Sequence, residues 1–125
     1  MILSSDSQEM EFRRQAIVAQ LQAQLTVLHD LNRRIPLLNY RESKHQLSSN
    51  NIDWTDHISN KLCLFERLLE IWEQPLWEMA AHRVNETFFQ LPNYKEKFER
   101  EIEPVQADVQ NREAFLWRMK RGFSK

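Results

Sequence analysis

Glycine is nearly absent from this sequence: the 125-residue chain contains one, Gly122. The tight turns that join neighbouring β-strands depend on glycine, and no Asn-Gly or Asp-Gly pair occurs. Dinucleotide-binding and P-loop motifs both need several glycines, so these phosphate-binding loops are excluded. The abundance of Glu, Gln, Leu and Arg therefore predicts an all-α protein.

Cysteine is equally scarce, because Cys63 is the only one. A single cysteine excludes an internal disulfide and a cysteine-based zinc site, and it is consistent with a reducing compartment. The N-terminus has neither a basic region nor a long apolar run, so we expect no signal peptide. The most apolar window, residues 62–72, is too short and too charged to span a membrane. We expect a cytoplasmic, single-domain protein over residues 1–125, with residues 1–7 frayed.

Between the prolines, apolar residues recur at steps of three and four, the spacing of one helix face. The first such stretch predicts a helix over residues 8–35. Pro36 should end it, because the residue before a proline is disfavoured in the α conformation. Its apolar face carries Met10, Ile17, Val18, Leu21, Leu25, Leu28, Leu31 and Ile35. Residues 36–52 lack a clear period and should form a long loop, functional or disordered, with disorder favoured.

The second predicted helix is the one around which the chain is organised. Asp53 is its expected N-cap, with Asp56 in the capping-box position. Its apolar stripe carries Ile58, Leu62, Phe65, Leu69, Trp72 and Leu76. The stripe continues in phase past Pro75 to Leu91. This phase favours one helix kinked at Pro75, and a new helix starting at Pro75 is the alternative.

A third predicted helix follows Pro92, with Asn93 and Glu96 forming a capping-box pattern. Its stripe stays in phase across Pro104 and runs to about residue 121, where Gly122 provides a C-terminal cap. The predicted architecture is a bundle of three long amphipathic helices running up-down-up. It would contain four to five helices if the chain breaks at Pro75 and Pro104.

Several large aromatic residues fall at the edge of these stripes or outside them. Those predicted to contact a partner are Trp77, Phe89, Trp117 and Phe123; Phe115 lies off the stripe as well. An excess of large apolar groups over what three helices can bury indicates a protein-binding surface, most simply a homodimer interface. The alternative is that a kinked helix turns these residues inward.

The C-terminal segment is the one part of the chain with a local charge bias. Its basic residues are Arg112, Arg118, Lys120, Arg121 and Lys125, against one acidic residue, Glu113. Cations interleaved with aromatic residues can hold phosphates and stack on bases, so this segment is the predicted nucleic-acid contact of an alternative function. The competing interpretation is an ordinary terminal helix whose basic residues suit the helix dipole.

Catalytic and metal sites receive less support. Glu78, His82 and Glu86 are spaced by four residues but lie opposite the apolar stripe, so a solvated face is favoured over a metal site. His57 falls on the apolar arc, where we expect a backbone carbonyl to satisfy it, and Cys63 is expected to be inert. We predict no catalytic residue, no metal and no cofactor; a metal-dependent bundle enzyme is the second alternative.

The leading hypothesis is a non-catalytic protein–protein interaction module: an adaptor, chaperone or inhibitor of a bacterial or phage system. It is expected to bind a protein partner or a second copy of itself, and not a membrane. Its size and helix layout loosely resemble those of type III secretion chaperones and phage-encoded inhibitors, without a shared motif.

Overall fold

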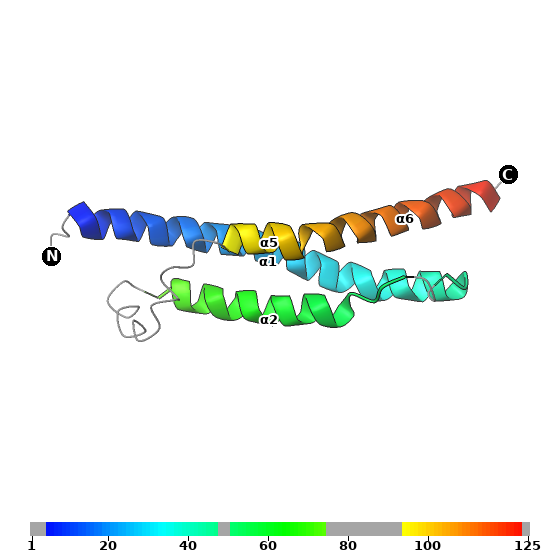
Figure 1. The fold of residues 1–125 in the computed structure, drawn as a ribbon, viewed down its shortest axis with the longest axis horizontal. Helices are drawn as coiled ribbons and strands as arrows, with labels where there is room; N and C mark the ends of the chain where they lie inside the picture. The colour runs from blue at the N-terminus through cyan, green and yellow to red at the C-terminus, as the bar shows by residue number, and fades with distance from the viewer. Residues whose placement is uncertain (1–4, 48–50, 75–93, 124–125) are drawn as a thin grey trace.

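The computed structural model describes residues 5–47, 51–74 and 94–123. These residues form helices α1 (Ser5–Lys44), α2 (Thr55–Trp72), α5 (Tyr94–Glu101) and α6 (Glu103–Phe123), with no strand among them (Figure 1). The predicted all-α class is therefore confirmed.

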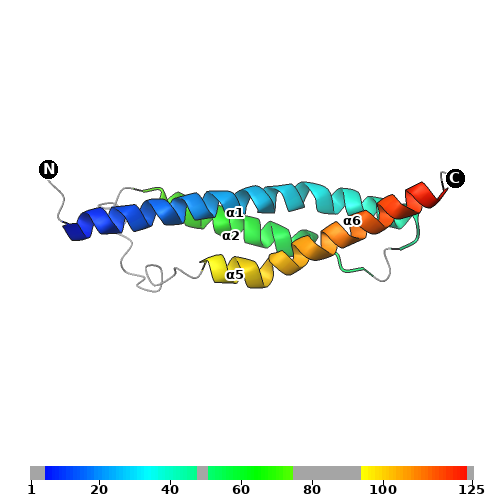
Figure 2. The ribbon, with the colours of Figure 1, turned by 90° about the horizontal axis from the view of Figure 1, so that it is seen from above.

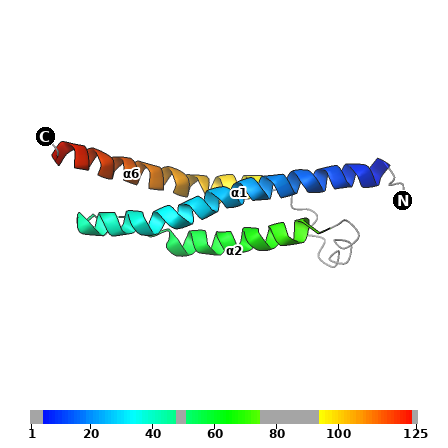
Figure 3. The ribbon, with the colours of Figure 1, turned by 180° about the vertical axis from the view of Figure 1, so that it is seen from behind.

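The helices lie side by side as an elongated bundle. α1 runs most of the length of the molecule, α2 returns antiparallel to it, and α5 and α6 together run back in the direction of α1 (Figures 1 and 2). The order is thus up-down-up, as predicted for three long helices. Seen from behind, α1 and α6 both continue past the first turn of α2 (Figure 3).

Most of the core residues belong to the apolar stripes that the sequence spacing predicts, whereas Leu38 lies beyond the predicted end of the first helix. The core contains Leu21, Leu25, Leu28, Leu31, Ile35 and Leu38 of α1; Ile58, Phe65, Leu68 and Trp72 of α2; and Tyr94, Phe98, Ile102, Val105, Val109 and Leu116 from the α5–α6 segment. Aromatic contacts join α2 to α5, where Phe65 packs on Phe98 and the Trp72 indole donates to the Tyr94 hydroxyl at 3.2 Å. Burial of these stripes is the main force holding the three segments together.

Pro36 lies inside α1, so the predicted end of the first helix at this residue is wrong. A proline in a helix interior leaves the carbonyl four residues earlier, that of Asn32, without its amide donor. Pro36 is exposed, so water can reach this side of the helix and bond the freed carbonyl. Beyond the proline, Leu38 and Glu42 are each only 2% exposed, and this burial favours a continued helix. The first half of the predicted loop is therefore helical.

α1 ends in a Schellman motif after Lys44. The amide of Leu47 donates to the carbonyl of Glu42 at 2.9 Å, and the amide of Gln46 donates to that of Ser43 at 3.2 Å. Gln46 has φ 59°, the left-handed conformation that glycine usually supplies in this motif. Because a glutamine stands there, the sequence carried no signal for this helix end.

Asp53 stabilises the start of α2 from one residue before the N-cap, so the expectation that Asp53 is itself the N-cap is wrong. Trp54 is the N-cap and makes no side-chain cap bond, whereas the Asp53 carboxylate accepts hydrogen bonds from the amide of Thr55 at 3.0 Å and its hydroxyl at 2.5 Å. These bonds hold the pKa of Asp53 below its usual range. Asp53 thus stabilises the first turn of α2 through Thr55, and not through the expected capping box with Asp56.

The predictions made at Pro75 and at Pro104 have different outcomes. α2 ends at Trp72 with Glu73 as its C-cap, so the favoured continuous helix through Pro75 is wrong. At Pro104 the turn around Ile102 keeps the helical spacing of hydrogen bonds: Ile102 N donates to Phe98 O at 2.8 Å, and Gln106 N donates to Ile102 O at 2.9 Å. α5 and α6 therefore form one segment interrupted at Ile102, two residues before Pro104, which agrees with the predicted in-phase stripe.

An ion pair between α2 and α5 should make stability fall in acid. Lys61 Nζ lies 2.6 Å from Glu101 Oε2 and holds the pKa of that carboxyl below its ordinary value. A carboxyl with a depressed pKa in the folded state contributes stability above its unfolded pKa of about 4.3, and this contribution is lost as the pH falls through the folded pKa. We expect Lys61→Met to give a flatter decline of the unfolding free energy between about pH 5 and about pH 3 than the wild type.

Urea unfolding at a series of pH values measures this slope. Lys95→Met, at an exposed position of the same helix as Glu101, is the matched control and should leave the slope unchanged. Equal slopes for Lys61→Met and the wild type would contradict the proposed contribution of the pair.

Candidate protein-binding groove

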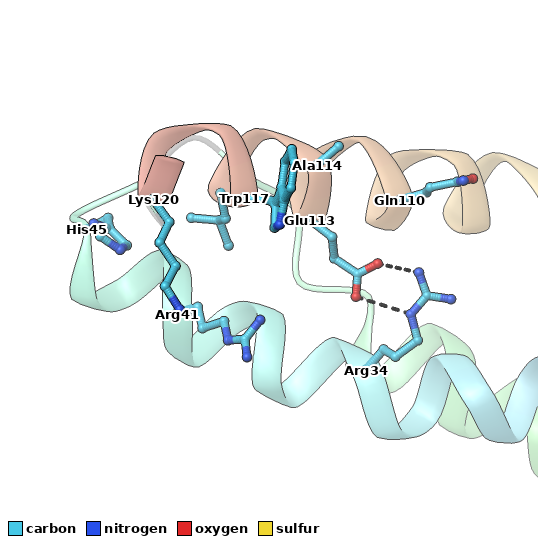
Figure 4. A pocket seen from close by; sticks show the side chains of 9 residues that line it. Arg34, Arg41, His45, Gln110, Glu113, Ala114, Trp117 and Lys120 are labelled. Atoms are coloured by element: carbon cyan, nitrogen blue, oxygen red, sulfur yellow. Dashed lines mark hydrogen bonds and ion pairs between the residues drawn. The ribbon is translucent and has the colours of Figure 1, made fainter. Parts of the chain in front are cut away.

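The C-terminal ends of α1 and α6 enclose a groove with a cavity volume of about 980 Å³ (Figure 4). Within the described ranges, no third helix covers this part of the α1–α6 pair (Figure 3). The lining residues are Arg34, Arg41 and His45 from α1 and the turn after it, and Gln110, Glu113, Ala114, Leu116, Trp117 and Lys120 from α6. We call this feature the α1–α6 groove.

Helical spacing places these side chains on facing surfaces. On α6, Glu113, Leu116, Trp117 and Lys120 are three or four residues apart along one face. On α1, seven residues separate Arg34 from Arg41, two turns of helix. Each helix therefore contributes one wall.

The inner end of the groove is closed by an ion pair. Arg34 Nε donates to Glu113 Oε2 at 3.1 Å, and a second Arg34 nitrogen contacts Glu113 Oε1, giving a two-point contact (Figure 4). Arg34 also donates to Asp30 at 2.8 Å. These two carboxylates raise the pKa of Arg34, and Arg34 in turn lowers the pKa of Asp30. Arg34 is thus paired with both Glu113 and Asp30, and its charge is shared between the two carboxylates.

The outer end of the groove is basic and aromatic. Lys120 extends from α6 toward α1, where Arg41 and His45 lie (Figure 4). The Trp117 side chain is 58% exposed at the groove. The guanidinium of Arg121 lies over its ring, 4.8 Å from the centroid, a cation–π contact that helps to hold the indole. A large apolar ring is therefore presented beside several cations.

A buried ion pair joins the same two helices away from the groove lining. Arg112 Nε donates to Glu42 Oε2 at 2.9 Å, and its Nη1 donates to the carbonyl of Ile52 and to Asp108, at 2.9 and 3.0 Å. Asn51 donates to the same Glu42 carboxylate at 2.7 Å. The bond to Glu42 is the main cause of the raised pKa of Arg112. This network fixes the spacing of α1 and α6 and so supports the groove between them.

Among the predicted partner-binding residues, Trp117 lies at the groove. Trp77 and Phe89 fall outside the described residues, as does the side chain of Phe123, the last residue of α6. Phe115 is 47% exposed and lines a smaller hollow of about 350 Å³. The alternative that a kink turns the aromatics inward is therefore wrong for Trp117 and Phe115.

The predicted nucleic-acid contacts are divided by the structure. Arg112 is buried and bound to Glu42, so its prediction as a nucleic-acid contact is wrong. Arg118, Lys120 and Arg121 are exposed, and Lys125 lies outside the described residues. The basic end of α1, with Arg41, Lys44 and His45, lies at the same end of the bundle as the last turns of α6 (Figure 1).

His57 agrees with the sequence-based expectation, because its Nε2 lies 3.1 Å from the carbonyl oxygen of Glu101. The expected metal-site alternative at Glu78, His82 and Glu86 falls outside the described residues. In the part of the chain that is described, no three His, Cys, Asp or Glu side chains are grouped as a metal site would require. The described helices also include none with the length and apolarity to cross a membrane.

The sequence reasoning missed Glu42 and Arg112, although a signal was present. Glu42 stands four residues after Leu38 in the buried stripe of α1, and Arg112 stands between Val109 and Leu116 in that of α6. A charged residue in phase with a buried stripe is expected to have a partner of opposite charge. Reading these two together would have predicted contact between the ends of the two helices.

Comparison of the chain with models of protein families, with characterised proteins and with solved structures finds no match. The function is therefore argued from the α1–α6 groove and its chemistry.

Proposed function

We propose that the protein is a non-catalytic protein–protein interaction module, an adaptor, chaperone or inhibitor, that receives a helical segment of its partner in the α1–α6 groove. The observation that carries the proposal is a groove between two helices that no third described helix covers, with Trp117 exposed at it. Amphipathic helices bind in grooves of this kind by inserting apolar side chains. The lone cysteine, Cys63, fits a cytoplasmic location for such a module.

The character of Trp117 supports this proposal. Tryptophan is enriched among the residues that contribute most to binding between proteins. Its ring is held from one side by Arg121, so little side-chain freedom remains to be lost on binding. The rest of α6 is held against α1 by the pairs Arg112–Glu42 and Arg34–Glu113, so the groove exists before a partner arrives.

We expect Trp117→Ser to lower the recovery of a bound protein partner at least about tenfold, the usual effect of removing a central interface tryptophan. The full chain is used as bait in extract of its source cells, and captured proteins are quantified by mass spectrometry, with cross-links sought to Lys120. Light scattering on the purified variants separates self-association from binding of another protein.

Phe12→Ser is the matched control, because Phe12 is an exposed aromatic residue of α1 near its other end. It should leave recovery unchanged. If Trp117→Ser and Phe12→Ser capture the same partners in the same amounts, the groove is not the interaction surface.

A second candidate function is nucleic-acid binding at the basic end of the bundle. It is favoured by one observation: Arg41 and His45 line the same groove as Lys120 and Trp117, so two basic segments distant in sequence lie together. This function requires binding of a single-stranded oligonucleotide that weakens steeply between about 50 and about 200 mM salt.

A further inference from the structure

We infer that the α1–α6 groove is built for an acidic amphipathic helix of a different protein, and not for a second copy of this chain. The inference rests on the proposed function and names the chemistry of the partner.

The charge of the groove is the first argument. Its lining includes the cations Arg34, Arg41 and Lys120 and a single carboxylate, Glu113. Arg34 contacts that carboxylate at two points, and the exposed guanidinium of Arg41 gives the outer end of the groove a positive potential. Carboxylates on the flanks of an incoming helix would be attracted there, which favours an acidic partner.

The apolar side chains of the lining are the second argument. Ala114 and Trp117 offer exposed apolar surface beside the largely buried Leu116, and the stems of the long basic side chains add to it. An amphipathic helix would bury its apolar stripe on this surface. A nucleic-acid backbone would find cations at the outer end but only one further donor on these three side chains, the indole N–H of Trp117, so a helix fits the whole lining better.

The length of the groove sets the size of the segment. Along α1 the lining runs from Arg34 to His45. At 1.5 Å per residue this distance is about 16 Å, the length of about three helical turns. A partner segment of eleven or more residues would therefore span the groove.

Symmetry argues against a second copy in the groove. In a two-fold dimer the same patch of each subunit faces the other. Two grooves that both carry an excess of cations would then face each other, and like charges brought close across an interface disfavour binding. The expected homodimer is thus not assigned to this surface.

The test uses two synthetic helical peptides with the same leucine stripe, one with glutamate and one with lysine at all flanking positions. Each is labelled with fluorescein, and its binding to the full-length chain is followed by anisotropy. We expect the glutamate peptide to bind at least about tenfold more tightly than the lysine peptide. Arg41→Glu should weaken binding of the glutamate peptide several-fold and strengthen binding of the lysine peptide.

Lys95→Glu is the charge-matched control, because it makes the same change of net charge at an exposed position of α5. It should leave both affinities within about twofold. Trp117→Ser should weaken both peptides, which places them in the groove and tests the proposed function separately from the charge preference.

Four results would overturn the inference. If the lysine peptide binds more tightly and Trp117→Ser abolishes this binding, the groove remains a docking site but its partner is basic. Absence of Trp117-dependent binding by either peptide would remove the proposed function as well. Displacement of the glutamate peptide by oligo(dT) would assign the groove to nucleic acid. A dimer in light scattering that dissociates in Trp117→Ser would assign it to a second copy.

Discussion

Replacing Glu42 with alanine is expected to lower the free energy of unfolding by about 3–5 kcal/mol, the cost of leaving a buried charge without its partner. The Glu42 side chain is 3% exposed and that of Arg112 is 10% exposed, so water cannot replace the lost carboxylate. Asp108 and the carbonyl of Ile52 would remain as acceptors for Arg112. Because small domains have only about 5–15 kcal/mol of total stability, this loss should be visible in a urea titration at pH 7.

The double replacement Glu42→Met with Arg112→Met should recover most of this loss. A buried ion pair can be exchanged for apolar side chains of similar volume at little cost, because no charge is then left desolvated. The single variants Glu42→Met and Arg112→Met and the double variant form a thermodynamic cycle that isolates the coupling between the side chains. We expect the double variant to be more stable than either single variant.

The exposed pair Glu9–Arg13 supplies the control, since both side chains are largely in solvent. Glu9→Ala should change stability by no more than about 0.5 kcal/mol. A similarly small effect of Glu42→Ala would mean that α1 and α6 do not bury this pair. The groove would then lose the contact that sets its width.

Replacing Pro36 with alanine is expected to raise the free energy of unfolding by about 2–3 kcal/mol, because a proline in a helix interior costs about 3 kcal/mol relative to alanine. Pro36 lies within α1 and is exposed, so no packing should be lost on its removal. Alanine restores an amide that can donate to the carbonyl of Asn32. The measurement is again urea unfolding, supported by an increase in helical circular dichroism.

Gln22→Ala, at another exposed position of α1, controls for the general helix preference of alanine and should change stability by less than about 0.5 kcal/mol. An unchanged or lower stability of Pro36→Ala would contradict a helix that continues through Pro36. The chain would then begin its loop there, as the sequence alone predicts.

Much of the fold could be predicted from local patterns. The near absence of glycine and the spacing of apolar residues determined the all-α class, the three long segments and the core stripes, because burial of one helix face depends on periodicity along the chain. The same pattern placed His57 at the core edge and left Trp117 outside the stripe. These features follow from positions three and four residues apart.

Tertiary structure decided where α1 ends and what its last turns contact. The local rule predicts that the helix stops before Pro36. Burial of Leu38 and pairing of Glu42 with Arg112 both require the helix to continue, and together they outweigh the cost of the proline. The turn that ends α1 places Gln46 in the left-handed conformation, and because this residue is not glycine, the composition did not indicate a helix end there. The continuation past Pro36 thus depends on contacts between residues distant in sequence, such as that of Glu42 with Arg112.

The α1–α6 groove likewise could not be predicted from the sequence. Periodicity identified Trp117 and the basic residues near it as unusual, but it could not place Arg41 and His45 opposite them. That placement requires the first helix to continue for two turns past Pro36 and the third segment to lie parallel to it. Local spacing determined which residues each helix exposes, and long-range packing decided which exposed faces meet, because only packing sets the distance between helices.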